Sequence, residues 1–145
     1  MPPELGFAGS LLDRCANQRS DEAWVAEQSN HPAARLILLD KDKVRVADGR
    51  IMFAACEGDA ILLGRDDDGA IFAAESPDPL EDARDLRTIA VQSLVPPSSQ
   101  AILAQARSML LWHQKHGFCS ACGAPTQIIS GKLCILCIAC FFITQ

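Results

Sequence analysis

The clearest hydrophobic pattern in the chain is a series of short apolar segments separated by turn residues. Each segment has about five residues rich in Val, Ile, Leu and Ala, and Asp- or Gly-containing turns divide one from the next. This pattern favours strands, because an amphipathic helix needs a longer segment with a 3.6-residue period. The predicted strands are Arg35–Leu39, Lys43–Ala47, Ile51–Ala55, Ala60–Gly64 and Ala70–Ala74. Since the links are short, we expect a small, largely antiparallel sheet.

Helical signals lie on both sides of this strand region. Residues 21–29 follow Ser20, a candidate capping hydroxyl, and begin with two acids at the positive end of the helix dipole. Trp24 is the expected anchor of this helix. The arm before it, GFAGSLLDRCANQR, has two glycines and is predicted to be extended or irregular. Residues 81–93 predict a second short helix.

A longer helix is predicted over residues 100–116. Its apolar side chains recur close to every 3.6 positions, Ser98 or Ser99 is a candidate cap, and Gly117 follows a basic last turn. The chain is thus expected to be α+β: a small sheet with flanking helices, then a long helix. This helix leads directly into a cysteine-rich segment.

That segment, residues 118–140, holds five of the seven cysteines. Cys119 and Cys122 form one C-x-x-C, and Cys137 and Cys140 form a second one after fourteen intervening residues. Two such turns supply the four thiolates of a tetrahedral Zn²⁺ site. Four cysteines leave no open coordination position, so we predict a structural zinc in a zinc ribbon.

Other ligand sets are also open. Cys134 and Cys137 form an equally good C-x-x-C, eleven residues after the first pair. His113 or His116, just upstream, could replace one thiolate. The remaining interpretation is that these are buried apolar cysteines without a metal.

Composition and charge limit the function further. The 145 residues are 49% hydrophobic, enough for a core, and carry a net charge of −5. No apolar run approaches the roughly 20 residues of a membrane span, and no secretory signal is visible at the start. Paired C-x-x-C motifs without an export signal favour reduced thiolates, so we expect a cytoplasmic protein without a membrane partner.

The acids are unevenly distributed. All eighteen lie at or before Asp85, while residues 86–145 carry four basic residues and no acid. Carboxylates are the usual ligands of Mg²⁺, and the last sixty residues offer none. The triple Asp66–Asp68 before Gly69 lacks the alternating ligands of a Ca²⁺ loop and predicts a hairpin turn. Thiolates on zinc would offset the basic residues, so nucleic acid is not an expected partner.

The chain resembles the N-terminal half of the NAD(H) pyrophosphatases, a branch of the Nudix hydrolases. The resemblance rests on GFAGSLLDR, on LLGRDDDG and on ARSMLLWHQKHGFCSACGAPT, in which Trp112, His113, His116 and Phe118 precede the first cysteine pair in the family's order. It implies a non-catalytic Nudix-like domain at residues 1–97, a connecting helix at 98–117, and a zinc ribbon at 118–145. It also implies Cys119, Cys122, Cys137 and Cys140 as zinc ligands.

The same resemblance implies a parent activity, the hydrolysis of NAD(H) to nicotinamide mononucleotide and AMP. In the family a Nudix box, G-x5-E-x7-R-E-x-x-E-E-x-G, holds the catalytic Mg²⁺ or Mn²⁺, and these 145 residues contain no such box. We therefore expect a zinc-binding module without intrinsic catalysis and assign no catalytic residue. The alternative is a stand-alone zinc-ribbon adaptor for protein or nucleic acid. A catalytic Nudix chain acting in trans and a homodimer through the apolar segment 133–145 are further expectations.

Overall fold

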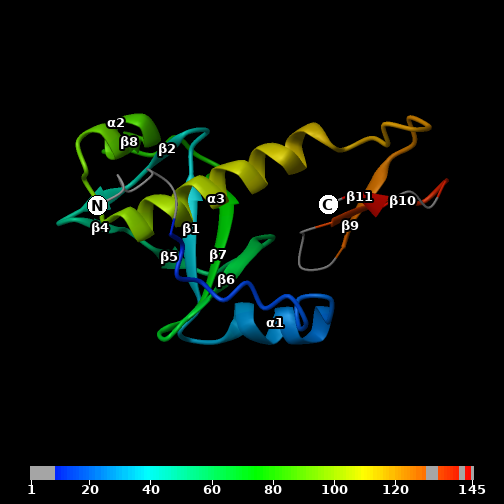
Figure 1. Ribbon diagram of the computed structural model, residues 1–145, viewed down its shortest axis with the longest axis horizontal. Helices are drawn as coiled ribbons and strands as arrows, with labels where there is room; N and C mark the ends of the chain where they lie inside the picture. The colour runs from blue at the N-terminus through cyan, green and yellow to red at the C-terminus, as the bar shows by residue number, and fades with distance from the viewer. Residues whose placement is uncertain (1–8, 130–133, 141–142, 145) are drawn as a thin grey trace.

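The computed structural model describes residues 9–129, 134–140 and 143–144. They form an α+β arrangement around a four-stranded sheet in the order β5-β1-β7-β6 (Figure 1). The strands of this sheet are β1 (Arg35–Leu39), β5 (Ala54–Ala55), β6 (Ile61–Asp66) and β7 (Gly69–Glu75). Two of its three pairings are antiparallel and β1–β7 is parallel, so the largely antiparallel α+β sheet predicted from the sequence is confirmed.

Two of the predicted strands are each split in two. Residues 43–47 divide into β2 (Lys43–Val44) and β3 (Val46–Ala47), and residues 51–55 divide between β4 (Arg50–Ile51) and β5. The division arises because the chain changes partner: β2 pairs with β8 (Arg84–Asp85), β3 pairs with β4, and β5 pairs with β1. Hydrophobic runs alone do not show such a change of partner.

The sheet is covered on both faces because alternate side chains of its strands point to opposite sides. On one face, Leu36 and Phe72 pack with Trp24 and Val25 of α1 (Glu22–Asn30). The opposite-facing residues of the same strands join a larger core with Leu103 and other residues of α3 (Pro97–Lys115). Figure 1 shows α1 below the strands and α3 crossing them on its way to the ribbon. Trp24 thus anchors α1 as predicted.

The helix starts differ from those predicted. Asp21, and not Ser20, caps α1, since its carboxylate accepts hydrogen bonds from the N–H groups of Ala23 and Trp24 at 3.0 and 3.2 Å. The second helix, α2 (Leu86–Val91), is shorter than residues 81–93, because Arg84–Asp85 pair with β2 and Asp85 caps the helix. The third begins at Pro97 with no side-chain cap, although Ser98 or Ser99 was the predicted cap.

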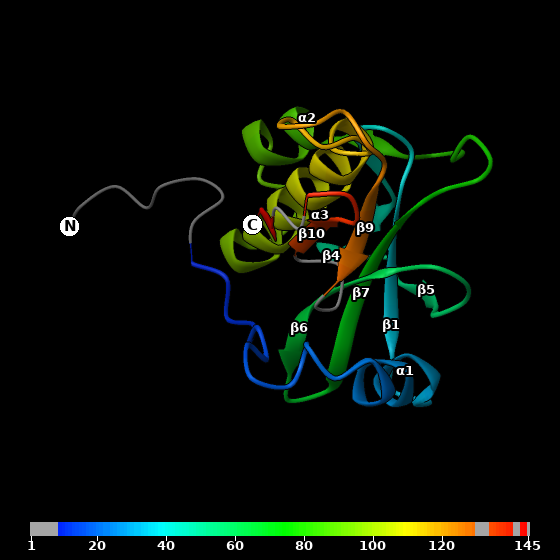
Figure 2. The same ribbon diagram turned by 90° about the vertical axis from the view of Figure 1, so that its right-hand side faces the viewer.

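Residues 9–20 form the predicted irregular arm, which lies along β6 (Figure 2). The backbones of Asp13 and Arg65 exchange two hydrogen bonds of 2.9 and 2.8 Å. Further along the same strand, Arg19 donates to the Leu62 carbonyl and Gln105 of α3 donates to the Leu63 carbonyl. Both carbonyls lie at an irregularity in the β6–β7 register, where a bulge turns backbone groups outward.

Beyond α3 the chain forms a small three-stranded sheet in the order β11-β10-β9. Its strands are β9 (Thr126–Ile129), β10 (Cys134–Cys137) and β11 (Ile143–Thr144). Among the described residues, no helix is long and apolar enough to cross a membrane. The division into domains at residues 97/98 and 117/118 stays a prediction.

Candidate metal centre

The first cysteine pair lies in a tight turn directly after α3. The Cys119 N–H donates to the Ala124 carbonyl and the Gly123 N–H donates to the Cys119 carbonyl, both at 2.8 Å. Gly123 has a φ of +74°, a left-handed conformation that favours glycine. The Ala121 N–H points at the Cys119 sulfur at 3.4 Å, so the turn directs a backbone dipole towards the place where thiolate charge would lie.

The second cysteine pair begins at the end of β10. Cys137 is buried in the last position of the strand, and the Cys140 N–H donates to its sulfur at 3.4 Å. Strand β10 pairs with β9, with Cys137 opposite Thr126, and this pairing brings the second turn beside the first. The ribbon hairpin therefore places two cysteine turns next to each other.

The structure gathers Cys119, Cys122, Cys137 and Cys140 into one cluster, with all four sulfurs within 4.8 Å of one another. The Cys119–Cys140 and Cys122–Cys137 sulfurs are 3.6 and 3.4 Å apart. These separations exceed a disulfide bond, and all four cysteines are free. Tetrahedral zinc with Zn–S bonds of about 2.3 Å requires sulfurs about 3.8 Å apart. The cluster therefore has the size and the donor atoms of a four-cysteine metal site.

The hydrogen bonds within the cluster favour the thiolate form of one cysteine over that of another. The Cys140 N–H hydrogen bond is the main cause that lowers the pKa of the Cys137 thiol to about 6. At Cys122 the N–H of Ala124 acts to lower the pKa, but the Cys137 sulfur and burial act against it, and the net pKa is raised. The lowered pKa favours the thiolate form of Cys137, whereas Cys122 has to release its proton to solvent when a cation binds its sulfur.

The other candidate ligands have different environments. The Nδ1 of His116 lies 2.7 Å from the Trp112 carbonyl oxygen, and the centres of the His116 and Trp112 rings are 5.1 Å apart. His116 therefore packs against the last turn of α3. Neither His116 nor His113 belongs to the four-cysteine cluster. Cys134 lies in β10, but its side chain lies outside the described part of the structure, as do residues 133, 141, 142 and 145 of the apolar segment 133–145.

Two cysteines of the N-terminal region lie apart from the cluster. Cys15 is buried in the arm, where burial first and Asp13 second raise the pKa of its thiol. Burial also raises the pKa of the Cys56 thiol. Neither Cys15 nor Cys56 belongs to the four-cysteine cluster.

Hydrogen bonds join the ribbon to the end of α3. The spacing of the sequence motifs does not predict them. Thr126, the first residue of β9, donates from its hydroxyl to the His116 carbonyl at 2.7 Å and from its N–H to the Gly117 carbonyl at 3.1 Å. These bonds engage the carbonyls of the two residues that directly follow α3. A threonine after a C-x-x-C is too common to have indicated this role.

The fold and the cluster together define the class of the protein: an α+β domain that a long helix joins to a ribbon with a four-cysteine metal-binding cluster. Within that class, the chain is distantly similar to the NAD-capped RNA hydrolase NudC of Mycobacterium tuberculosis and of Mycobacterium bovis. Each is 29% identical over 136 residues, an alignment that covers 81% of this chain and 43% of the relative. The resemblance to NAD(H) pyrophosphatases seen in the sequence is confirmed as a distant similarity.

The alignment covers only part of each relative, and this limits which of their properties can be assigned to this chain. The chain spans less than half the length, 43%, of the curated relatives that it matches. No protein-family model matches the chain. The similarity therefore concerns most of this chain, and the activity named for the relatives is a matter for proposal.

Proposed function

We propose that this chain is the N-terminal and zinc-ribbon portion of a protein resembling an NAD(H) pyrophosphatase, and that the ribbon binds one structural Zn²⁺. The observation that carries the proposal is the gathering of four sulfurs within 4.8 Å at the end of α3. Cys119, Cys122, Cys137 and Cys140 would be the ligands. When bound, the metal supplies folding free energy to a ribbon of short strands, and four thiolates leave it no position for substrate.

Metal analysis of the purified protein tests this proposal. We expect about one zinc per chain under reducing conditions. Cys122→Ser should lower the zinc content, and the matched control Cys56→Ser should leave it unchanged, because Cys56 is not a member of the cluster. Absence of zinc from the unaltered protein, or equal zinc in both variants, would contradict the assignment.

The second part of the proposal concerns catalysis. The 145 residues on their own should not hydrolyse NADH in the presence of Mg²⁺ or Mn²⁺. The reason is chemical: metal-assisted attack of water on a pyrophosphate needs a cluster of carboxylates around the cation. The last sixty residues contain none, and the sequence has no Nudix box. Release of AMP that follows the protein through purification, with the Cys122→Ser variant as comparison, would overturn this proposal.

A second candidate function is that of a ribbon adaptor that binds a protein. Its support is the exposure of two large apolar side chains beside the cluster, Phe118 at 69% and Ile138 at 61%. The partner would be a second copy of the chain or a separate catalytic Nudix chain, in a reducing compartment such as the cytoplasm. Deletion of residues 141–145 should shift a dimer towards monomer with zinc retained, as measured by light scattering. A protein that is already monomeric before the deletion would refute the dimer.

A further inference from the structure

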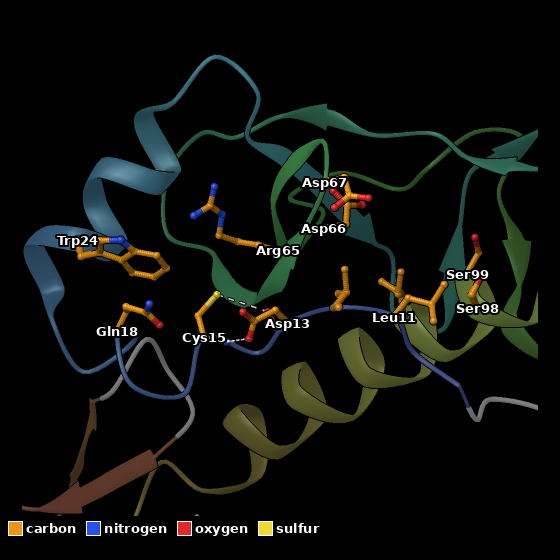
Figure 3. A pocket seen from close by; sticks show the side chains of 12 residues that line it. Leu11, Asp13, Cys15, Gln18, Trp24, Arg65, Asp66, Asp67, Ser98 and Ser99 are labelled. Carbon is orange, nitrogen blue, oxygen red and sulfur yellow. Dashed lines mark hydrogen bonds between the residues drawn. The ribbon is translucent and has the colours of Figure 1, made fainter.

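A second candidate binding site lies in the sheet domain, apart from the cysteine cluster. It is a cavity of about 560 Å³ between the arm, α1, the β6–β7 turn and the start of α3. This volume is within the roughly 300–1,000 Å³ typical of small-molecule sites. Figure 3 shows Trp24, Gln18 and Arg65 gathered at one end of the cavity, and Ser98 and Ser99 at the other.

The sheet register explains why Trp24 and Arg65 lie on the same face of the sheet. Arg65 lies directly opposite Ala70 in the β6–β7 pair, and residues opposite each other project from the same face of a sheet. Ala70 packs in the apolar cluster that also contains Trp24. Trp24 is held in place by its helix, whose Asp21 cap accepts a hydrogen bond from the Trp24 backbone N–H. A rigid indole and a guanidinium thus border the same cavity from two different elements.

Three polar side chains that line the cavity are available to a ligand. Among the residues that the structure describes, Arg65, Gln18 and Asp67 have no side-chain hydrogen bond or ion pair. Arg65 is fixed through its backbone instead, which exchanges hydrogen bonds with Asp13. Asp66, by contrast, is engaged by Arg35. The cavity therefore offers a planar cation, an amide that both donates and accepts, and one free carboxylate.

We propose that this cavity binds a planar heteroaromatic ring with neutral hydroxyl substituents, the chemistry of a nucleoside. The ligand's ring would stack on the Trp24 indole, and the Arg65 guanidinium would lie over or beside the ligand's ring. Stacking of this kind does not select one base over another, because every base has a π face. Gln18 can donate to and accept from the ring edge, and the Asp67 carboxylate accepts hydroxyl hydrogens.

The charge of the cavity argues for a neutral ligand. Asp13 and Asp67 border it together with one arginine, Arg65, while the third carboxylate, Asp66, is paired with Arg35, so unpaired carboxylates outnumber the lining cations. A triphosphate would meet these carboxylates, and like charges brought together cost binding free energy. Adenosine should therefore bind more tightly than ATP. This order separates the proposed site from a general anion site.

Fluorescence titration can test the site, because the chain has two tryptophans and only Trp24 borders the cavity. In a Trp112→Phe background, adenosine should quench Trp24 saturably with a Kd of about 1 mM or below. Arg65→Ala should weaken binding about tenfold, and Gln18→Ala should also weaken it. The matched control, Arg87→Ala, removes an exposed arginine outside the cavity and should bind adenosine unchanged.

Several results would overturn the proposal. They are a linear, unsaturable response to adenosine, equal affinity in the Arg65→Ala and Arg87→Ala proteins, or tighter binding of ATP than of adenosine. Circular dichroism of each variant establishes that it is folded, which is expected because Arg65 and Gln18 are exposed. Zinc content is an independent readout, so failure of this site leaves the metal proposal standing, and the reverse also holds.

Discussion

Gly64 provides the sharpest test of how the arm is held against the sheet. A Cβ atom at this position would lie 2.5 Å from the Asp13 carbonyl oxygen and 3.0 Å from the Leu12 Cβ. Ordinary contact begins at 3.4 Å, so Gly64→Ala must push the arm away by roughly 0.9 Å (3.4 − 2.5). The group that has to move is backbone, and the neighbouring Asp13–Arg65 hydrogen bonds hold it in place.

The expected loss of stability follows from these contacts. Two backbone hydrogen bonds at about 0.5–1.5 kcal/mol each give about 1–3 kcal/mol, the same range as measured for overpacked sites. Urea unfolding followed by tryptophan fluorescence should show a lower midpoint with an unchanged slope. The Asp13 amide should also exchange its hydrogen faster, because the arm moves away from β6.

Gly117→Ala is the matched control. An added Cβ there meets no atom within 4 Å and the backbone is not left-handed, so its free energy of unfolding should change by less than about 0.5 kcal/mol. If Gly64→Ala is as stable as Gly117→Ala, and the Asp13 amide stays protected, the arm is not held in the way described.

Three other perturbations follow from the site and the helix ends. Asp21→Ala should destabilise the sheet domain by about 0.5–2 kcal/mol, while Ser20→Ala should change its stability little, as measured by thermal unfolding. Equal losses of stability in the two variants would contradict the assignment of the cap to Asp21. Thr126→Val should lower the protection of the ribbon amides against hydrogen exchange, because it removes the bond to the His116 carbonyl; unchanged protection would show that this bond is dispensable. The apparent zinc affinity, measured by competition with a chelator at each pH, should fall more steeply with pH below about 6 than above it, because Cys137 then also has to release a proton when the metal binds; an equal slope on both sides of pH 6 would contradict this.

The elements best predicted from the sequence are those in which local signals and tertiary contacts agree. Strand β1 has the predicted bounds, and the Asp66–Gly69 turn joins two strands within two residues of those expected. The four clustered cysteines were also recognisable, because a C-x-x-C turn depends on local backbone geometry. A pair of such turns needs only one hairpin to bring it together, and β9–β10 supplies that hairpin.

The features missed depend on contacts between distant segments. The start of α2 is set by Arg84 pairing with Val44, which keeps residues 84–85 extended. The cap at Asp21 was missed because Ser20 has an equal capping propensity, and only the turn before the helix decides between them. The cavity beside Trp24 requires the parallel crossover from β1 to β7, and no motif marks Arg65 as its neighbour. Residue spacing gives no information about pairing across such distances.

The contacts along β6 also bear on how copies of this protein behave towards each other. An outer strand with open backbone groups is a template on which strands of other molecules can add, the usual start of sheet aggregation. Here the arm occupies the backbone of Arg65, and Arg19 and Gln105 occupy the carbonyls of the bulge. At the opposite edge, β5 has two residues and offers little length for pairing. Proteolytic removal of residues 9–20 would therefore leave the backbone of β6 open to pairing with other strands. The sheet domains of separate molecules would then associate through this edge.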